Sequence, residues 1–87
     1  MKPGEDIIVE GLSDLMQGNE TIASLLVSIG APRLQQIGID VPVQTIASPE
    51  HRLYSILHAS EPDSAHSRYN ALIRRLVSFE RAVQCGP

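Results

Sequence analysis

The amino-acid sequence predicts an all-α fold: a compact bundle of four main helices plus a short helical turn, with a long C-terminal helix as its spine. Three observations support this prediction. The segment 60–84 has the apolar periodicity of a long helix, helix start and stop signals recur along the chain, and no two segments carry matching strand patterns. The length of 87 residues and the hydrophobic content of 43% fit one small globular domain spanning residues 1–87.

The C-terminal segment carries the most regular helical pattern. Its apolar residues recur at alternating steps of four and three, which places them on one side of a helix. This apolar stripe consists of Ala65, Tyr69, Leu72, Leu76, Phe79 and Val83. Ile73 and Val77 widen the stripe, so the helix is expected to face a core or a partner along most of its length. At its start, Ser60 can cap, Pro62 fits the first turn, and Asp63 suits the positive end of the helix dipole.

Two shorter helices are predicted in the first third of the chain. The segment 5–17 places several apolar residues on one helical face. They are Ile8, Leu12, Leu15 and Met16. A break follows, and Asn19 is the predicted cap of a second helix that runs to about Ile29. Gly30 and Pro32 are typical of a helix end, so the second helix is expected to stop there.

The middle of the chain is predicted to be less regular. Residues 32–37 could form one or two helical turns, and residues 39–47 favour an extended connector whose aliphatic side chains are buried. A strong helix start follows, with Ser48 as the cap and Pro49 in the first turn. This helix is expected to run to about Ala59 and to lead through a tight corner into the long C-terminal helix.

The net charge of −3 is unevenly distributed along the chain. Residues 1–48 contain six acids and two basic residues, whereas residues 49–87 contain five arginines and four acids. The simplest expectation is that the two halves form ion pairs with each other within the fold. Because the sequence shows neither a secretory leader nor an apolar run of about 20 residues, a cytoplasmic location without membrane contact is expected.

The C-terminal arginines support an alternative function, a helix-turn-helix DNA-binding transcriptional regulator. Its recognition helix would begin near Ser64. The possible nucleic-acid contacts are Arg68, Arg74 and Arg75, none of which has an acid three or four positions away on its own helix. The acidic net charge opposes this interpretation, because DNA-binding domains usually carry a basic excess.

The sequence contains no recognisable catalytic, metal-binding or cofactor-binding motif. His51 and His58 are two helical turns apart, whereas a pair of metal ligands on one helix needs a spacing of three or four. No serine lies in a glycine-flanked turn, and Cys85 lies close to the chain terminus. The sequence therefore predicts a non-enzyme without a cofactor.

The favoured function is protein–protein interaction, as an adaptor, an accessory subunit or an antitoxin-like regulator. A chain of this length with one cysteine and no metal-ligand cluster has a small core, and such chains often gain stability from a partner. The expected partner is a second copy of the chain, in a homodimer, or a larger protein. The predicted interface residues are Tyr69, Leu72, Arg75, Leu76, Phe79 and Val83.

Overall fold

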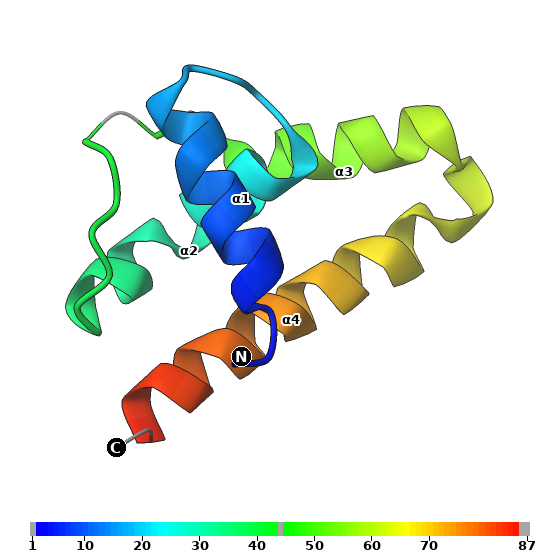
Figure 1. The fold of residues 1–87 in the computed structure, drawn as a ribbon. Coiled ribbons are helices and arrows are strands. Elements are labelled where there is room, and N and C mark those ends of the chain that lie inside the picture. Colours follow the sequence, from blue (N-terminus) through cyan, green and yellow to red (C-terminus); the bar gives the residue numbers. More distant parts are fainter. Residues whose placement is uncertain (1, 44, 86–87) are drawn as a thin grey trace.

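Helices dominate the computed structural model of the protein, which describes residues 2–43 and 45–85 (Figure 1). In chain order the elements are α1 (Glu5–Met16), α2 (Ile22–Gln36), α3 (Pro49–Ser60), the 3-10 helix η1 (Pro62–Ser64) and α4 (Ala65–Cys85). No strand occurs among the described residues. The predicted all-α bundle is confirmed, and its longest helix is the C-terminal one, as the sequence predicts.

The hydrophobic core is built around α2. Nine of its residues are buried, and Leu25, Leu26 and Leu34 are completely inaccessible to solvent. A helix that is apolar on all sides is stable only when other elements cover it, and α1, α3 and α4 all pack against α2. The Cα radius of gyration of 12.5 Å is close to the roughly 12 Å expected for a compact chain of this length.

The predicted end of the second helix at Gly30 is wrong. α2 continues through Gly30 and Pro32 to Gln36, so the helical turn predicted for residues 32–37 is its last part. Gly30 serves a close helix approach instead, because a Cβ there would lie 2.7 Å from Cδ1 of Leu76 in α4. Pro32 is exposed and lies inside α2, which lacks one N–H donor at this position.

The start of α2 also differs from the prediction, because its cap is Thr21 and not Asn19. Thr21 Oγ1 accepts a hydrogen bond from the Ser24 N–H at 3.1 Å, and Ser24 Oγ accepts one from the Thr21 N–H at 2.7 Å. This capping box satisfies two backbone donors that a helix start leaves unpaired. Thr21 Oγ1 also donates to Asp14 Oδ2 at 2.6 Å, which joins the start of α2 to α1.

The connector between α2 and α3 is not helical in its described residues, in agreement with the predicted extended segment. Val41 is buried, and Ile39 and Ile46 are half-buried. The Ile46 N–H donates to Ser28 Oγ at 3.2 Å, which holds the connector against α2. The predicted burial is wrong for Val43, which is 99% exposed and lies at a bend of the connector.

α3 and α4 form a helical hairpin whose corner contains η1 (Figure 1). Pro49 occupies the first turn of α3 as predicted, and Leu53 and Leu57 are buried. The predicted cap Ser48 makes no side-chain hydrogen bond to the helix, because its left-handed backbone (φ 49°) differs from the extended conformation of a capping serine. The segment predicted as the long C-terminal helix begins with the 3-10 helix η1, and its α-helix, α4, starts at Ala65.

Two glycines allow α1 to pack closely on its neighbours. At Gly4, where φ is 74°, a Cβ would lie 2.6 Å from the carbonyl oxygen of Arg75. At Gly11, a Cβ would collide with the carbonyl oxygen of Ala23 and lie 2.5 Å from Cγ2 of Val27. The start of α1 therefore lies against α4 and its middle lies against α2 (Figure 1).

Candidate protein-binding grooves

The predicted interface residues lie on both sides of the point where the start of α1 meets α4. Leu76 and Phe79 are only 4% and 5% exposed, because α2 and the start of α1 pack against them. Arg75 is exposed. The half-buried members of the predicted interface are Tyr69, Leu72 and Val83. Part of the predicted interface thus belongs to the core of the chain, and the remainder borders two grooves.

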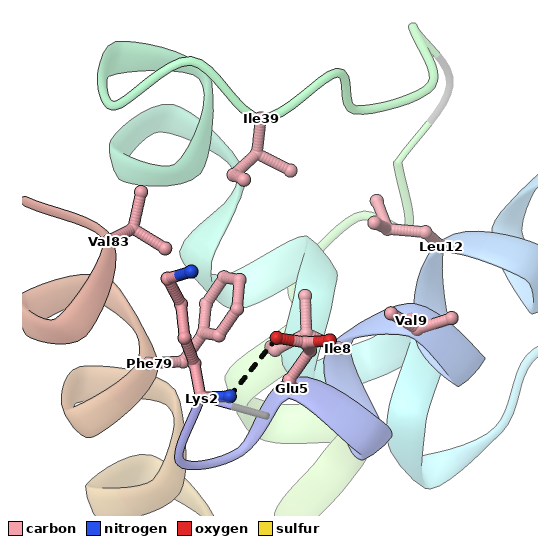
Figure 2. A pocket seen from close by; sticks show the side chains of 8 residues that line it. All are labelled: Lys2, Glu5, Ile8, Val9, Leu12, Ile39, Phe79 and Val83. Atoms are coloured by element: carbon pink, nitrogen blue, oxygen red, sulfur yellow. Dashed lines mark hydrogen bonds between the residues drawn. The ribbon is translucent and has the colours of Figure 1, made fainter. Parts of the chain in front are cut away.

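The first groove lies between α1, the connector and the C-terminal part of α4 (Figure 2). It has a volume of about 310 Å³. Its apolar lining consists of Ile8, Val9, Leu12, Ile39, Phe79 and Val83. Lys2 and Glu5 complete the lining, and the backbone N–H of Lys2 donates to Glu5 Oε1 at 3.1 Å. Two residues of the predicted interface, Phe79 and Val83, therefore face this space.

A second hollow, of about 220 Å³, lies farther along α1. This hollow is lined by Leu12, Met16, Asp40 and Pro42. Leu12 lines both hollows, so they adjoin at this side chain, and we call the two together the apolar groove. Val9 is 58% exposed and Met16 is 79% exposed along it.

The exposure of the α1 side of the apolar groove was not predicted from the sequence. The helical pattern placed Met16 on the buried face, and Val9 was considered only as part of an alternative short strand, Ile7-Ile8-Val9. A signal was present in the succession Ile7-Ile8-Val9. Successive helical residues point in directions about 100° apart, so three consecutive apolar residues cannot all face one core. In the structure Ile8 is buried, Ile7 is half-buried and Val9 faces solvent.

The second groove, which we call the arginine-flanked groove, lies on the other side of the α1–α4 contact and has a volume of about 240 Å³. It is lined by Ile22, Arg68, Ala71, Leu72 and Arg75. Arg75 Nη2 lies 2.8 Å from Asp6 Oδ1 in α1. The Asp6 carboxylate accepts hydrogen bonds from the backbone N–H of Ile7 and from the Arg75 guanidinium. Both lower the pKa of Asp6 below its usual value, and the Ile7 N–H has the larger effect.

The three arginines predicted as possible nucleic-acid contacts have different surroundings. Arg75 is paired with Asp6, and Arg68 Nη1 lies 4.0 Å from Glu61 Oε2. Arg74 is exposed and makes no ion pair with any described residue.

Ion pairs between the two halves of the chain confirm an expectation drawn from the charge distribution. Asp6 and Glu20 belong to the acidic first half, and Arg75 and Arg52 belong to the second half. Arg52 donates twice to Glu20, from Nη2 at 2.6 Å and from Nε at 3.0 Å. Because these pairs are exposed, each adds little to stability, typically about 0–1 kcal/mol.

A cluster of aromatic rings, which the sequence did not suggest, lies between α3 and α4. The Tyr54 and His58 rings stack with centroids 6.3 Å apart, and Tyr54 meets the edge of Tyr69 at 5.9 Å. Burial and the neighbouring Glu50 carboxylate raise the pKa of Tyr69. The spacing of four between Tyr54 and His58 on a predicted helix was the available signal. Because the rings come from both helices, the cluster packs the hairpin together.

A polar hollow of about 340 Å³ lies beside the Arg52–Glu20 pair, with His51 and Ser55 in its lining. The charged groups of this hollow already bind each other, which makes it a weak candidate for a ligand. Within residues 2–43 and 45–85, no group of three or more His, Cys, Asp or Glu side chains is placed to hold a metal ion. In the same part of the chain, no helix combines the length and apolar character that crossing a bilayer requires.

Comparisons of the chain with protein-family models, curated proteins and solved structures found no match.

Proposed function

We propose that the protein is a small protein–protein interaction module that binds its partner through the apolar groove. This proposal rests on the exposure of Val9 and Met16 beside the apolar lining of the groove. Covering such side chains contributes roughly 25 cal/mol per Å² of apolar surface removed from water. Exposed apolar hollows of this kind commonly mark interaction sites.

The groove is formed by elements whose relative position is well fixed. α1 contributes Val9, Leu12 and Met16, and α4 contributes Phe79 and Val83. The close packing at Gly4 and Gly11 holds α1 in place, so a partner meets a preformed surface and loses little free energy in ordering it. This suits an adaptor, an accessory subunit or an antitoxin-like regulator that acts by binding, either to a larger protein or to a second copy of itself.

Site-specific photo-cross-linking in cells that express the protein tests this function. A photoreactive amino acid at Met16 should give a cross-linked product of discrete mass, because this side chain borders the groove and is 79% exposed. The same amino acid at Gln17, the next residue and also exposed, should give little of this product. The proposal would be wrong if neither position gave a discrete product and the purified chain were also monomeric.

DNA binding is a second candidate function, supported by the short corner between α3 and α4 and by the exposed, unpaired Arg74 among the described residues. The in-chain contacts of Arg75 and Arg68 oppose it. We expect weak or no binding to a DNA duplex near physiological salt. If instead a tight complex formed, weakened steeply with salt and disappeared when all three arginines were replaced by Ala, DNA binding would replace our proposal.

A further inference from the structure

We infer that the apolar groove accepts an amphipathic helix from a different protein, with lysine or arginine residues flanking its apolar face. This inference rests on the proposed function and specifies the partner. Three properties of the groove lead to it, namely its length, its lack of a strand edge and its charge.

The length of the groove matches about three turns of a helix. Its lining on α1 extends from Glu5 to Met16, a span of roughly 16 Å at the usual rise of about 1.5 Å per residue. Val9, Leu12 and Met16 follow each other at steps of three and four, so their side chains form a row along α1. A partner helix of similar length can place apolar residues at the same steps into this row.

Binding of an extended peptide to a strand edge is not available on this surface. The groove is lined by helices and by a non-helical connector, and no strand occurs among the described residues. The backbone N–H and C=O groups of α1 are used within the helix, so a peptide strand would find no row of partners there. An amphipathic helix needs only the apolar contacts of the groove and polar contacts at its rim.

The charge around the groove is negative. Glu5 lies at one end of the groove and Asp40 lies in its second hollow, whereas Lys2 is the single basic residue of the lining. α1 itself carries four acids and no lysine or arginine. Of the four α1 acids only Glu5 lines the groove, whereas Asp6 is paired with Arg75 and Asp14 accepts a hydrogen bond from Thr21. Glu5 and Asp40, from the connector, are the two acids that face a ligand there. Basic residues on both flanks of the partner helix would complement them.

The same charges oppose a second copy of the chain as the occupant. In a two-fold dimer formed through this groove, the same surface patch occurs on both subunits. Each copy would then present Glu5 and Asp40, against one Lys2, to a partner surface of the same net negative charge. Like charges across an interface weaken association, and therefore a basic helix of another protein fits the groove better.

Binding of designed peptides to the full chain tests the inference. The probe is a fluorescent helical peptide of about 14 residues with leucines at steps of three and four and lysines on both flanks. A matched peptide carries glutamate in place of every lysine. By fluorescence anisotropy at low salt, the lysine peptide should bind at least about tenfold more tightly than the glutamate peptide, and added salt should reduce the difference.

Substitutions in the chain then locate the binding. Val9→Lys and Met16→Lys should each weaken binding of the lysine peptide by about tenfold or more, because each removes an apolar contact and adds a repelling charge. Gln17→Lys adds the same charge to an exposed position outside the groove lining and should change binding by less than about threefold. Circular dichroism of each variant checks that the fold is intact, as expected for positions that are 58% and 79% exposed.

Three outcomes would overturn the inference. They are equal binding of both peptides, no binding of either peptide, and equal loss of binding in Met16→Lys and Gln17→Lys. A dimer of the chain that Met16→Lys dissociates would place a second copy in the groove and would also overturn it. In each case a discrete cross-link from Met16 in the cell would leave the interaction function standing, so the two proposals can fail separately.

Discussion

At Gly11 the packing between α1 and α2 leaves no room for a side chain. We expect Gly11→Ala to destabilise the protein although alanine favours a helix, because a Cβ would collide with the Ala23 carbonyl oxygen and crowd Val27. Overpacking typically costs about 1–3 kcal/mol, which exceeds the roughly 1 kcal/mol gained in helix propensity. Urea denaturation followed by circular dichroism measures the change in the free energy of unfolding.

Gly30→Ala provides a matched comparison within the same core. Its new Cβ would meet the terminal methyl groups of Leu76, which can move, whereas a backbone carbonyl in a packed helix cannot. The loss of stability should therefore be smaller for Gly30→Ala than for Gly11→Ala. The opposite order would show that α1 can shift on α2 more easily than its packing suggests.

The pKa of the Asp6 carboxylate should be sensitive to the ion pair between Asp6 and Arg75, which borders the arginine-flanked groove. Its pKa is lowered first by the Ile7 N–H and then by Arg75, so Arg75→Gln should raise this pKa without removing the whole shift. Because the folded-state pKa is the lower one, the related stability is present above the unfolded pKa of about 3.9 and is lost as pH falls through the folded value.

NMR titration of the side-chain carboxyl carbon measures the pKa of Asp6 directly. Arg74→Gln is the matched control, since Arg74 makes no ion pair among the described residues. It removes the same charge from a neighbouring position of α4. If both variants shifted the Asp6 pKa equally, the effect would come from the general charge of α4 and not from the 2.8 Å contact.

At the level of elements, one hydroxyl group holds the connector against α2. Ser28 Oγ accepts from the Ile46 N–H at 3.2 Å and donates to the Ser24 carbonyl oxygen at 2.9 Å. We expect Ser28→Ala to speed hydrogen exchange at the Ile46 amide and to lower stability by about 1 kcal/mol, the usual net contribution of one hydrogen bond, because the Ile46 N–H is only partly buried. Ser55→Ala, at an exposed position of α3, should change neither quantity.

The elements also show where reasoning from sequence succeeds and where it does not. The periodicity of α4 predicted which side of the helix faces inward, but only Ala65, Leu76 and Phe79 of its stripe are buried. Tyr69, Leu72 and Val83 are half-buried. The local stop signals at Gly30 and Pro32 did not end α2. Gly30 allows the close contact with Leu76. Leu34, which lies beyond both signals in α2, is fully buried. Tertiary packing of a helix commonly outweighs the local preference of one or two residues.

The candidate site was predictable only in part for a related reason. Phe79 and Val83 belong to the stripe that the sequence identifies, and both line the apolar groove. The opposite wall comes from Val9, Leu12 and Ile39, which are distant in sequence and meet α4 only through the tertiary fold. Helical periodicity identifies the face of one helix, but it does not specify which other segment lies opposite.

At the scale of the whole molecule, the apolar and charged surfaces together bear on self-association. Leu76 and Phe79 of α4 are at most 5% exposed, so the chain itself covers two of the six residues of the predicted interface. The net charge of −3 makes two copies repel each other weakly, and the acids Glu5 and Asp40 line the apolar groove. Both features favour a single chain in the absence of a partner.

Light scattering coupled to size exclusion, run with reductant because Cys85 is exposed, should therefore give the monomer mass of 9.5 kDa at micromolar concentration. A dimer would contradict this expectation, and two variants would then locate its interface. Met16→Lys would dissociate a dimer formed through the apolar groove, and Ala71→Lys would dissociate one formed through the arginine-flanked groove. Arg75→Glu is a poorer probe, because it would place a second carboxylate beside Asp6 and disturb α1 as well as the interface. Dissociation by Ala71→Lys alone would support the homodimer predicted along Leu72 and Arg75 and would leave the apolar groove free for its basic helix.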